Sequence, residues 1–491
     1  MARNTRKVLA FGAVTIALGG CMATGGAQVP SASAPITQKE AQMGAQYHPQ
    51  FLAEFGGAMS GPQATYVEQI GKNVAVQSGL GNARETFTVS LLNSPVNNAF
   101  AVPGGYIYTT RQLVTLMNNE AELAGVLGHE VGHVAARHSQ RREKAAQKNS
   151  ILGLLGAIGS SILLGDSGIG QQISQGFLQG SQLLTLKFSR KQELEADDLG
   201  IQYLGRAGYD RRAMSTVLAS LAAQNTLDAR LQGRNASVPA WASTHPDPAS
   251  RVQSALAKAG TASTGVTNRD TFLTRIDGLL YGDDPAQGMI EGNTFIHPDL
   301  RLAFTAPQGF YMVNGTRAVS IQGQGGQAQM TTAAYNGNLE TYVRNAFTAL
   351  GGQNSTLAPS EMQRTTVNGL PAVYGTARVN NGNSQVDVVV FAYEFARDKA
   401  FHFAVIAPAG RAATFDGMFQ SMRRISQAEA GAVVPKKLQV VTVARSDTVQ
   451  SLSRRMAYDS AQEERFRVLN ALGGSATVTP GQKVKLVVRA R

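Results

Sequence analysis

The sequence predicts an α+β protein in three parts: a mostly helical domain with a small sheet, a second α+β domain and a small C-terminal module. The length of 491 residues allows roughly three domains, at about 100–200 residues each. Helical periodicity dominates residues 39–260, whereas alternating, strand-like runs recur over 293–428. Hydrophobic residues make up 43% of the chain and charged residues 16%, which excludes a wholly disordered protein.

An export signal is predicted over residues 1–20. Basic residues precede an apolar run at 8–18, whose length is typical of a signal peptide rather than of a membrane span. The run leads into Leu-Gly-Gly-Cys at 18–21, which resembles a bacterial lipobox. Cys21 is the only cysteine of the chain. We therefore expect it to be lipidated, with residues 21–38 as a flexible tether.

The residue after the cysteine indicates a location. It is Met22 rather than Asp, which in the resembled lipoproteins implies transport to the outer membrane. We therefore expect a bacterial cell-envelope protein that is lipid-anchored to the outer membrane and faces the periplasm. The sequence has no apolar run of about 18 residues or more, which excludes a polytopic membrane protein. The formal net charge of +12 favours anionic partners, but export argues against nucleic acid.

The strongest chemical signal is His-Glu-Val-Gly-His at 129–133. Two histidines four apart on a helix face the same point, so His129 and His133 can supply half of a tetrahedral Zn²⁺ site. Glu130 projects beside them, where it can take a proton from water at the metal. The sequence therefore predicts a metal centre on a helix that begins at about 118–120.

A further histidine, His138, follows nine residues after His129. On a continuous helix His138 projects about 180° away from His129, so we expect it on the surface. The extended motif with a third histidine needs glycine at 136 and histidine at 139, where this chain has Ala136 and Ser139. The third metal ligand must therefore come from another segment.

A second, acidic helix is predicted to start near residue 189. Glu193 and Asp197 are four residues apart and share one face, so Glu193 can bind the metal while Asp197 accepts a hydrogen bond from a ligand histidine. Glu195 projects about 200° away from Glu193, toward the opposite side. An acidic helix alone is typical of a solvated surface, but the upstream pair of histidines favours a role in the metal centre.

These two motifs, HEVGHVAARH at 129–138 and ELEADDLG at 193–200, resemble family 48 of the metallopeptidases. These are the HExxH–ExxxD zinc peptidases, which include the CAAX prenyl protease. The segments at 98–114 and 244–251 are similar to the bacterial periplasmic, BepA-like branch of the family. The similarity covers about 39–260, which is under half of the chain.

The resemblance implies a zincin-like (gluzincin) domain with one Zn²⁺ per chain, bound by His129, His133 and Glu193. His245 would reach the oxyanion or cap the metal in a resting state, and Arg251 would assist it. An edge strand beside the active-site helix would pair with an extended peptide substrate, with an ordinary sheet edge as the alternative. The matching residues are Asn98, Ala99, Phe100 and Ala101.

The C-terminal residues 436–491 resemble a LysM module, a small βααβ glycan-binding fold, although Ser446 replaces the common glycine before Asp-Thr. The segment carries 11 Lys/Arg and 4 Asp/Glu, a balance of +7. Peptidoglycan or anionic lipid is therefore an expected partner, and a merely solvated basic surface is the alternative. Residues 261–292 are expected to be a linker, and the domain at 293–428 has no assignable role.

The sequence therefore predicts an outer-membrane-anchored, periplasm-facing zinc endopeptidase. The resemblance alone implies misfolded or stalled envelope proteins as its substrates. One alternative is a chaperone or scaffold with weak or latent protease activity, bound to the cell wall. A second alternative, a cell-wall hydrolase, rests only on the LysM-like module. The apolar stretch at 151–164 is either a buried hairpin or a membrane-facing loop.

Overall fold

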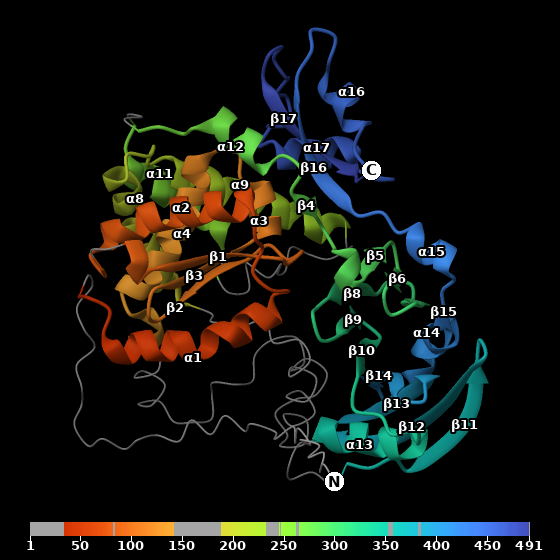
Figure 1. The fold of residues 1–491 in the computed structure, drawn as a ribbon. Helices are drawn as coiled ribbons and strands as arrows, with labels where there is room; N and C mark the ends of the chain where they lie inside the picture. Colours follow the sequence, from red (N-terminus) through yellow and green to blue (C-terminus); the bar gives the residue numbers. More distant parts are fainter. Residues whose placement is uncertain are drawn as a thin grey trace, which may run out of the picture.

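The computed structural model describes residues 34–81, 84–141, 188–231, 245, 247–261, 265–351, 357–381 and 384–490. It has the mixed α+β architecture that the sequence predicts (Figure 1). Cys21 and the apolar stretch at 151–164 lie outside the described residues. Within the described part of the chain, no helix is both long enough and apolar enough to cross a membrane.

The helical domain surrounds a small three-stranded sheet. Its strands lie in the order β1-β3-β2, with β1 parallel and β2 antiparallel to β3. The strands are β1 (Thr88–Leu92), β2 (Ala99–Val102) and β3 (Tyr106–Thr110). The described helices are α1 (Gln38–Glu54), α2 (Pro62–Ala75), α3 (Arg111–Leu116), α4 (Glu120–Ala135), α8 (Arg190–Arg206), α9 (Ala213–Leu231) and α11 (Pro248–Ala259). Short 3-10 turns follow α2, at Val76–Ser78 and Arg84–Thr86.

Helices α1 and α4 cover opposite faces of this sheet. Side chains alternate along a strand, so each face has its own set of apolar residues to bury. Ala101 and Ile107 face the core that contains α4. Phe100 and Tyr108 face the other way, stack with ring centroids 4.6 Å apart, and pack against Phe51 of α1. The sheet therefore lies between α1 and α4.

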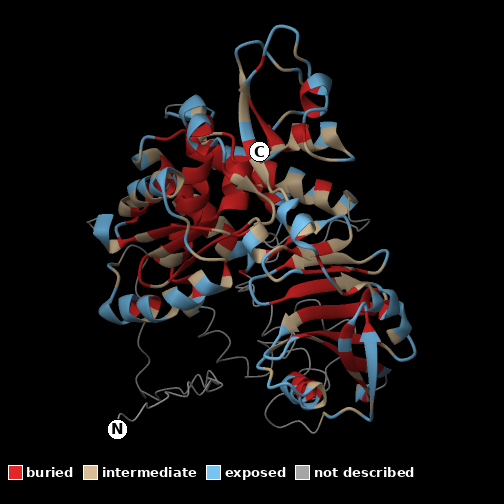
Figure 2. Ribbon diagram, turned by 45° about the vertical axis from the view of Figure 1, so that its right-hand side comes forward, coloured by how far each residue is buried: buried red, intermediate tan, exposed pale blue. Residues whose placement is uncertain are grey.

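Helix α4 is the centre of the domain. Asn119 caps it by accepting a hydrogen bond from the backbone N–H of Glu122. All its residues except Val134 are buried, because α2, α8, α9 and the sheet surround it (Figure 2). The helix ends at Ala135, and Arg137 then adopts a left-handed backbone conformation with φ of 51°. The chain therefore turns sharply just after the HExxH motif.

The second domain contains a seven-stranded antiparallel sheet with a separate core on each face. Helix α13 (Leu339–Gly351) packs on one face, and α14 (Asp416–Ser421) packs on the other with a four-stranded sheet. The large sheet consists of β11 (Glu361–Val367), β12 (Leu370–Asn381), β13 (Ser384–Ala396), β14 (Lys399–Pro408), β10 (Gly326–Thr332), β9 (Val319–Gly323) and β8 (Tyr311–Asn314). The small sheet consists of β15 (Arg423–Arg424), β7 (Leu302–Thr305), β6 (Thr294–His297) and β5 (Met289–Glu291).

The C-terminal module has the predicted strand–helix–helix–strand order. Its elements are β16 (Lys436–Thr442), α16 (Val449–Ser453), α17 (Gln462–Leu469) and β17 (Lys483–Arg489). A short helix, α15 (Gln427–Gly431), precedes it, and the second domain also holds 3-10 turns at Pro285–Gln287 and Ala412–Phe415.

The range 261–292, expected to be a linker, instead forms structure. It contains α12 (Arg269–Ile276) and β4 (Leu280–Tyr281), and β4 pairs with β16 in the sheet of the C-terminal module. The expectation fails because Phe272 and Leu273 of α12 are buried in the core of the helical domain. The same core includes Leu438 and Leu486 of the C-terminal module, so this module is built into the helical domain rather than attached to it.

Candidate metal centre

Helix α4 presents the two histidines of the HExxH motif. His129 and His133 are both buried, and their Nε2 atoms lie 3.0 Å apart. Buried polar atoms require partners, and two Nε2 lone pairs cannot satisfy each other. The two nitrogens must therefore share either a proton, in an N–H···N hydrogen bond, or a cation that both of them bind.

Helix α8 supplies the acidic side chain that meets them. Ser189 and Gln192 form a capping box at its start, which fixes the first turn just before Glu193. Glu193 is fully buried, and its carboxylate oxygens lie 3.6 Å from His129 Nε2 and 3.4 Å from His133 Nε2. The structure thus brings together the three side chains that we predicted as ligands.

His245 completes this cluster from the segment before α11. Its Nδ1 lies 3.3 Å from His129 Nε2 and 3.2 Å from Glu193 Oε1. One ligand atom from each of His129, His133, Glu193 and His245 lies within 4.8 Å of the others. His245 therefore lies close enough to the other three side chains to share a metal ion with them.

The cluster has the size of a tetrahedral metal site. Zinc bonds of about 2.0–2.1 Å to nitrogen and oxygen imply about 3.3–3.4 Å between neighbouring ligand atoms. Five of the six pairs among the four side chains have contacts of 3.0–3.6 Å, and all four ligand atoms lie within 4.8 Å of one another. Three imidazoles and one carboxylate are also a donor set that suits Zn²⁺. The residues therefore fit one Zn²⁺ ion.

Asp197 orients one of the ligand histidines. Its Oδ1 accepts a hydrogen bond from His129 Nδ1 at 2.9 Å, so the proton of that ring is on Nδ1 and the Nε2 lone pair faces the cluster. This contact is the one that the ExxxD spacing predicts.

Arg251 lies behind the carboxylates rather than at the position where an oxyanion would form. Its guanidinium donates to Asp197, with Nε 2.8 Å from Oδ2, and also to Glu193. The assistance to the oxyanion expected for Arg251 is therefore not seen, because two buried carboxylates occupy its donors. Arg251 instead holds Glu193 and Asp197 in place.

The histidines around Glu193 lower the pKa of its carboxyl group. Burial alone would raise the pKa of Glu193, but the neighbouring His245, His129 and His133 outweigh it and hold the pKa well below its ordinary value. The carboxylate form of Glu193 is the one that binds a metal.

Glu130 lies beside the cluster with different surroundings. Burial, with the nearby negative charge of Glu193, raises the pKa of Glu130 to about 8. Its carboxylate accepts a hydrogen bond from the backbone N–H of Ala101 on β2 and lies 3.4 Å from His245 Nε2.

The predicted substrate strand lies next to Glu130. Among the described strands, β2 pairs only with β3, so one edge of β2 is unpaired. That edge faces α4, because the N–H of Ala101 points at Glu130. The four residues predicted to bind substrate are all buried: Asn98, Ala99, Phe100 and Ala101.

His138 is not on the surface, contrary to our expectation. It is fully buried, and its Nδ1 lies 2.8 Å from His133 Nδ1. The expectation assumed a continuous helix, whereas α4 ends at Ala135 and the turn at Arg137 returns the chain toward His133. Glu195, expected to project away from Glu193, lies outside the metal-binding group and meets His138 Nε2 at 3.2 Å.

Phe188 is a site residue that the sequence analysis missed. Its ring stacks on His133 with centroids 4.0 Å apart and planes tilted by 21°. Phe188 is buried and directly precedes the capping box of α8. An aromatic residue just before a predicted helix start is the one sequence feature that could have indicated its role.

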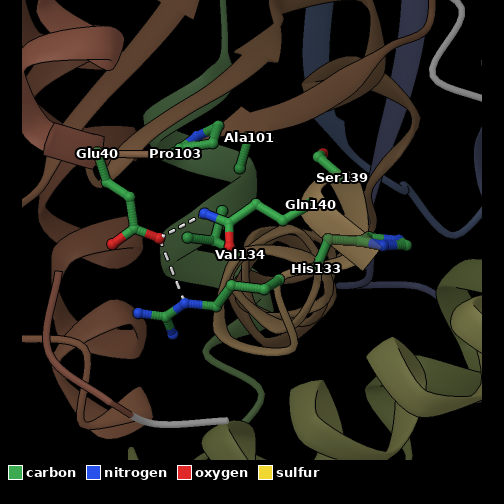
Figure 3. Close-up of a pocket in the computed structure, with 8 residues that line it drawn as sticks. Glu40, Ala101, Pro103, His133, Val134, Ser139 and Gln140 are labelled. Carbon is green, nitrogen blue, oxygen red and sulfur yellow. Dashed lines mark hydrogen bonds and ion pairs between the residues drawn. The ribbon is translucent and has the colours of Figure 1, made fainter. Parts of the chain in front are cut away.

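A small pocket lies between β2 and the end of α4 (Figure 3). Glu40 of α1 closes one side, where it accepts a hydrogen bond from Gln140 at 3.0 Å and pairs with Arg137 at 3.3 Å. The lining residues are Glu40, Ala101, Pro103, His133, Val134, Arg137, Ser139 and Gln140. The N-terminal segment is thereby tied to the turn after the HExxH helix.

Comparison with known proteins identifies relatives of this domain. A family model described as Peptidase family M48 matches residues 62–259. The beta-barrel assembly-enhancing protease of Escherichia coli O157:H7 is 34% identical over 219 residues, which cover 44% of this chain and 43% of that protein. The mitochondrial metalloendopeptidase OMA1 of Schizosaccharomyces pombe is 30% identical over 217 residues, which cover 44% of this chain and 59% of that protein.

The match to the assembly-enhancing proteases thus spans less than half of their length. A third relative, the metalloprotease YcaL of Escherichia coli K12, is 30% identical over 236 residues, which cover 45% of this chain and 87% of that protein. Because a relative is covered almost throughout and the family model spans the helices that carry the metal centre, the chain belongs to peptidase family M48.

Proposed function

We propose that this protein is a zinc metalloendopeptidase of the bacterial envelope. The observation that carries the proposal is the buried convergence of His129, His133 and Glu193, with Glu130 beside them. Curated relatives named as metalloendopeptidases and proteases support it. One Zn²⁺ per chain is the expected cofactor.

Zn²⁺ bound by these residues would acidify a water molecule and polarise the scissile carbonyl. Glu130, which lies beside the cluster, accepts the proton of the attacking water and later returns it to the leaving amine. His245, only 3.4 Å from Glu130, donates a hydrogen bond to the oxyanion once substrate has displaced it from the cluster. Arg251 and Asp197 keep the ligands oriented.

An extended peptide is the substrate form that this geometry favours. Among the described strands, the edge of β2 away from β3 is unpaired and lies beside Glu130, and backbone pairing there would demand little of the substrate's sequence. We propose misfolded or stalled envelope proteins as substrates, which agrees with relatives named beta-barrel assembly-enhancing protease.

The cellular setting of the proposal is the periplasmic face of the outer membrane, with a lipid on Cys21. The lipobox-like sequence at 18–21 supports it. The variant Cys21→Ser should move the protein from the membrane fraction to the soluble periplasm or stall its processing. Unchanged fractionation and maturation would contradict the anchor. The basic segment 436–491 supports a further contact with peptidoglycan or anionic lipid, which should weaken with added salt.

A scaffold or chaperone with latent proteolysis is the second candidate. The position of His245 favours it, because His245 fills the fourth place of the cluster and contacts both Glu193 and Glu130. In this alternative substrate binds at β2 without displacing His245, so cleavage remains slow even when zinc is bound.

Metal analysis with a cleavage assay tests the proposal. The variant Glu130→Gln should retain about one zinc per chain and lose casein cleavage by at least the ~10²–10⁴-fold typical of a general base. Undiminished cleavage would assign the activity to another site or a contaminant. Negligible cleavage by zinc-loaded wild-type protein, with retained binding of unfolded substrate, would favour the scaffold.

A further inference from the structure

A row of side chains runs from the metal centre toward the surface. His133 Nδ1 lies 2.8 Å from His138 Nδ1, and both residues are buried. His138 Nε2 lies 3.2 Å from Glu195 Oε2, and Glu195 also accepts hydrogen bonds from Arg141. No step of the proposed mechanism uses His138 or Glu195.

The protons in this row have one consistent arrangement. His133 Nε2 faces the cluster, 3.0 Å from His129 Nε2, so a His133 that binds metal carries its proton on Nδ1. His138 Nδ1 must then accept that proton's hydrogen bond. The proton of His138 is consequently on Nε2, where it faces the Glu195 carboxylate. Each N–H of the row meets an acceptor.

The backbone holds His138 in this position at a conformational cost. Arg137, the preceding residue, has a φ of 51°, which is unfavourable for a side chain with a Cβ and persists only where the surroundings enforce it. Arg137 donates to the backbone carbonyls of Ala34 and Pro35 and pairs with Glu40, so the N-terminal segment stabilises the turn. Gln192 of α8 also donates to the backbone carbonyl of His138.

We propose that His138 is a positioning residue of the metal centre and that Glu195 fixes its tautomer. His138 would orient His133 as Asp197 orients His129. Helix α8 would then supply a metal ligand, the outer partner of His129 and the carboxylate that holds His138. The inference rests on the proposed function, because it assumes that His133 binds zinc. Loss of such an outer partner typically weakens metal binding by about 10–100-fold.

The test measures zinc affinity by chelator competition, together with the visible absorption spectrum of the Co²⁺-substituted full-length protein. His138→Leu should bind zinc about 10–100-fold more weakly and shift the Co²⁺ bands. His138→Gln should stay closer to wild type, because its amide can accept from His133 and donate to Glu195. Glu195→Gln should lie between the two, since a neutral acceptor replaces a charged one.

Controls separate this role from simple packing. Asp198→Asn removes a carboxylate of the same helix that faces Lys258 at the surface, and it should leave zinc affinity unchanged. Thermal unfolding of the metal-free proteins checks that each variant is folded, and Glu195→Gln keeps the test available if His138→Leu does not fold.

Wild-type zinc affinity and an unshifted Co²⁺ spectrum in folded His138→Leu would overturn the inference. Equal losses in the Leu and Gln variants would also overturn it, because they would indicate packing rather than hydrogen bonding. A wild-type protein that binds no zinc would contradict the proposed function itself, so the two failures are distinguishable.

Discussion

Four carboxylates within one short stretch of α8 differ in role because each faces a different neighbour. Glu193 faces the cluster, Asp197 holds His129 and Arg251, Glu195 meets His138, and Asp198 pairs with Lys258 at the surface. The ExxxD spacing predicted the first two, since residues four apart share a helix face. The contact between Glu195 and His138 could not be predicted, because it depends on where α4 ends and on a left-handed arginine that has no sequence signature.

The removal of single carboxylates from α8 should rank their roles. Glu193→Gln should abolish both tight zinc binding and cleavage, because the amide replaces a charged ligand. Asp197→Asn should lower zinc affinity by about 10–100-fold, since it loses the charged acceptor of His129 and a partner of Arg251. Zinc stoichiometry after dialysis against a weak chelator measures both. Retained zinc in Glu193→Gln would show that our ligand assignment is wrong.

A buried histidine outside the metal centre should make stability depend on pH. Burial lowers the pKa of His402 from 6.5 to about 4, and its Nδ1 accepts a hydrogen bond from Tyr342. The folded state therefore favours the neutral ring. Its stabilisation is complete above pH 6.5 and is lost as the pH falls from 6.5 to about 4, a change of about 3 kcal/mol for 2.5 units. The free energy of unfolding, measured with urea at several pH values between 4 and 6.5, should depend much less on pH in His402→Gln than in the wild type. An identical slope in both proteins would contradict the assignment.

At the scale of elements, the metal centre depends on the close approach of α4 and α8. Gly132 lies against Ala196, and Gly128 lies against Gly200, so the two helices meet through backbone rather than side chains. This contact brings Glu193 within reach of His129 and His133. The sequence indicated both helices from their periodicity and motifs, but the pairing of small residues across the two helices was recognisable only once their crossing was known.

A methyl group at this crossing should separate the helices. The Cβ of Gly132→Ala would lie 2.9 Å from the backbone oxygen of Ala196, and a backbone atom cannot move cheaply. We expect a loss of about 1–3 kcal/mol in stability and weaker zinc binding, despite the better helix propensity of alanine. Gly125→Ala is the matched control, because the new Cβ would lie 3.5 Å from its nearest neighbour, the side chain of Leu204. It should be neutral or stabilising by up to about 1 kcal/mol in thermal unfolding. Equal behaviour of the two variants would exclude the crossing as the cause.

At the scale of the whole molecule, composition and periodicity predicted three parts but not how they join. Residues 261–292 were expected to be a linker because a short element such as β4 has no periodicity of its own. Its stabilisation comes from distant segments, through pairing with β16 and a hydrogen bond from Arg111 to the Leu280 carbonyl. The sequence also indicated that the C-terminal module is a separate part of the chain, because the module resembles LysM, a small fold of its own. In the structure, Leu438 and Leu486 share one core with the HExxH helix.

One residue links the C-terminal module directly to the start of that helix. The ammonium group of Lys485 is buried and donates to the backbone carbonyls of Thr115, Leu116 and Met117, at 2.9, 3.1 and 2.7 Å. Burial lowers the pKa of Lys485 to about 7, although the nearby Glu122 of α4 opposes this shift. The module therefore satisfies the orphan carbonyls at the end of α3, just before α4 begins.

Removal of the module should consequently destabilise the protease domain rather than merely release it from the cell wall. Deletion of 436–491 exposes the core around α12 and α4, and we expect the thermal midpoint of the zinc-loaded protein to fall by roughly 10 °C or more. Lys485→Met is the milder variant and should cost about 1–3 kcal/mol, because three buried carbonyls lose their donor. Lys483→Met, two residues away with an exposed contact to Thr274, should stay within about 0.5 kcal/mol of wild type. If the truncated protein unfolds at the wild-type temperature and cleaves casein normally, the module is an appendage after all, and the shared core contributes little to stability.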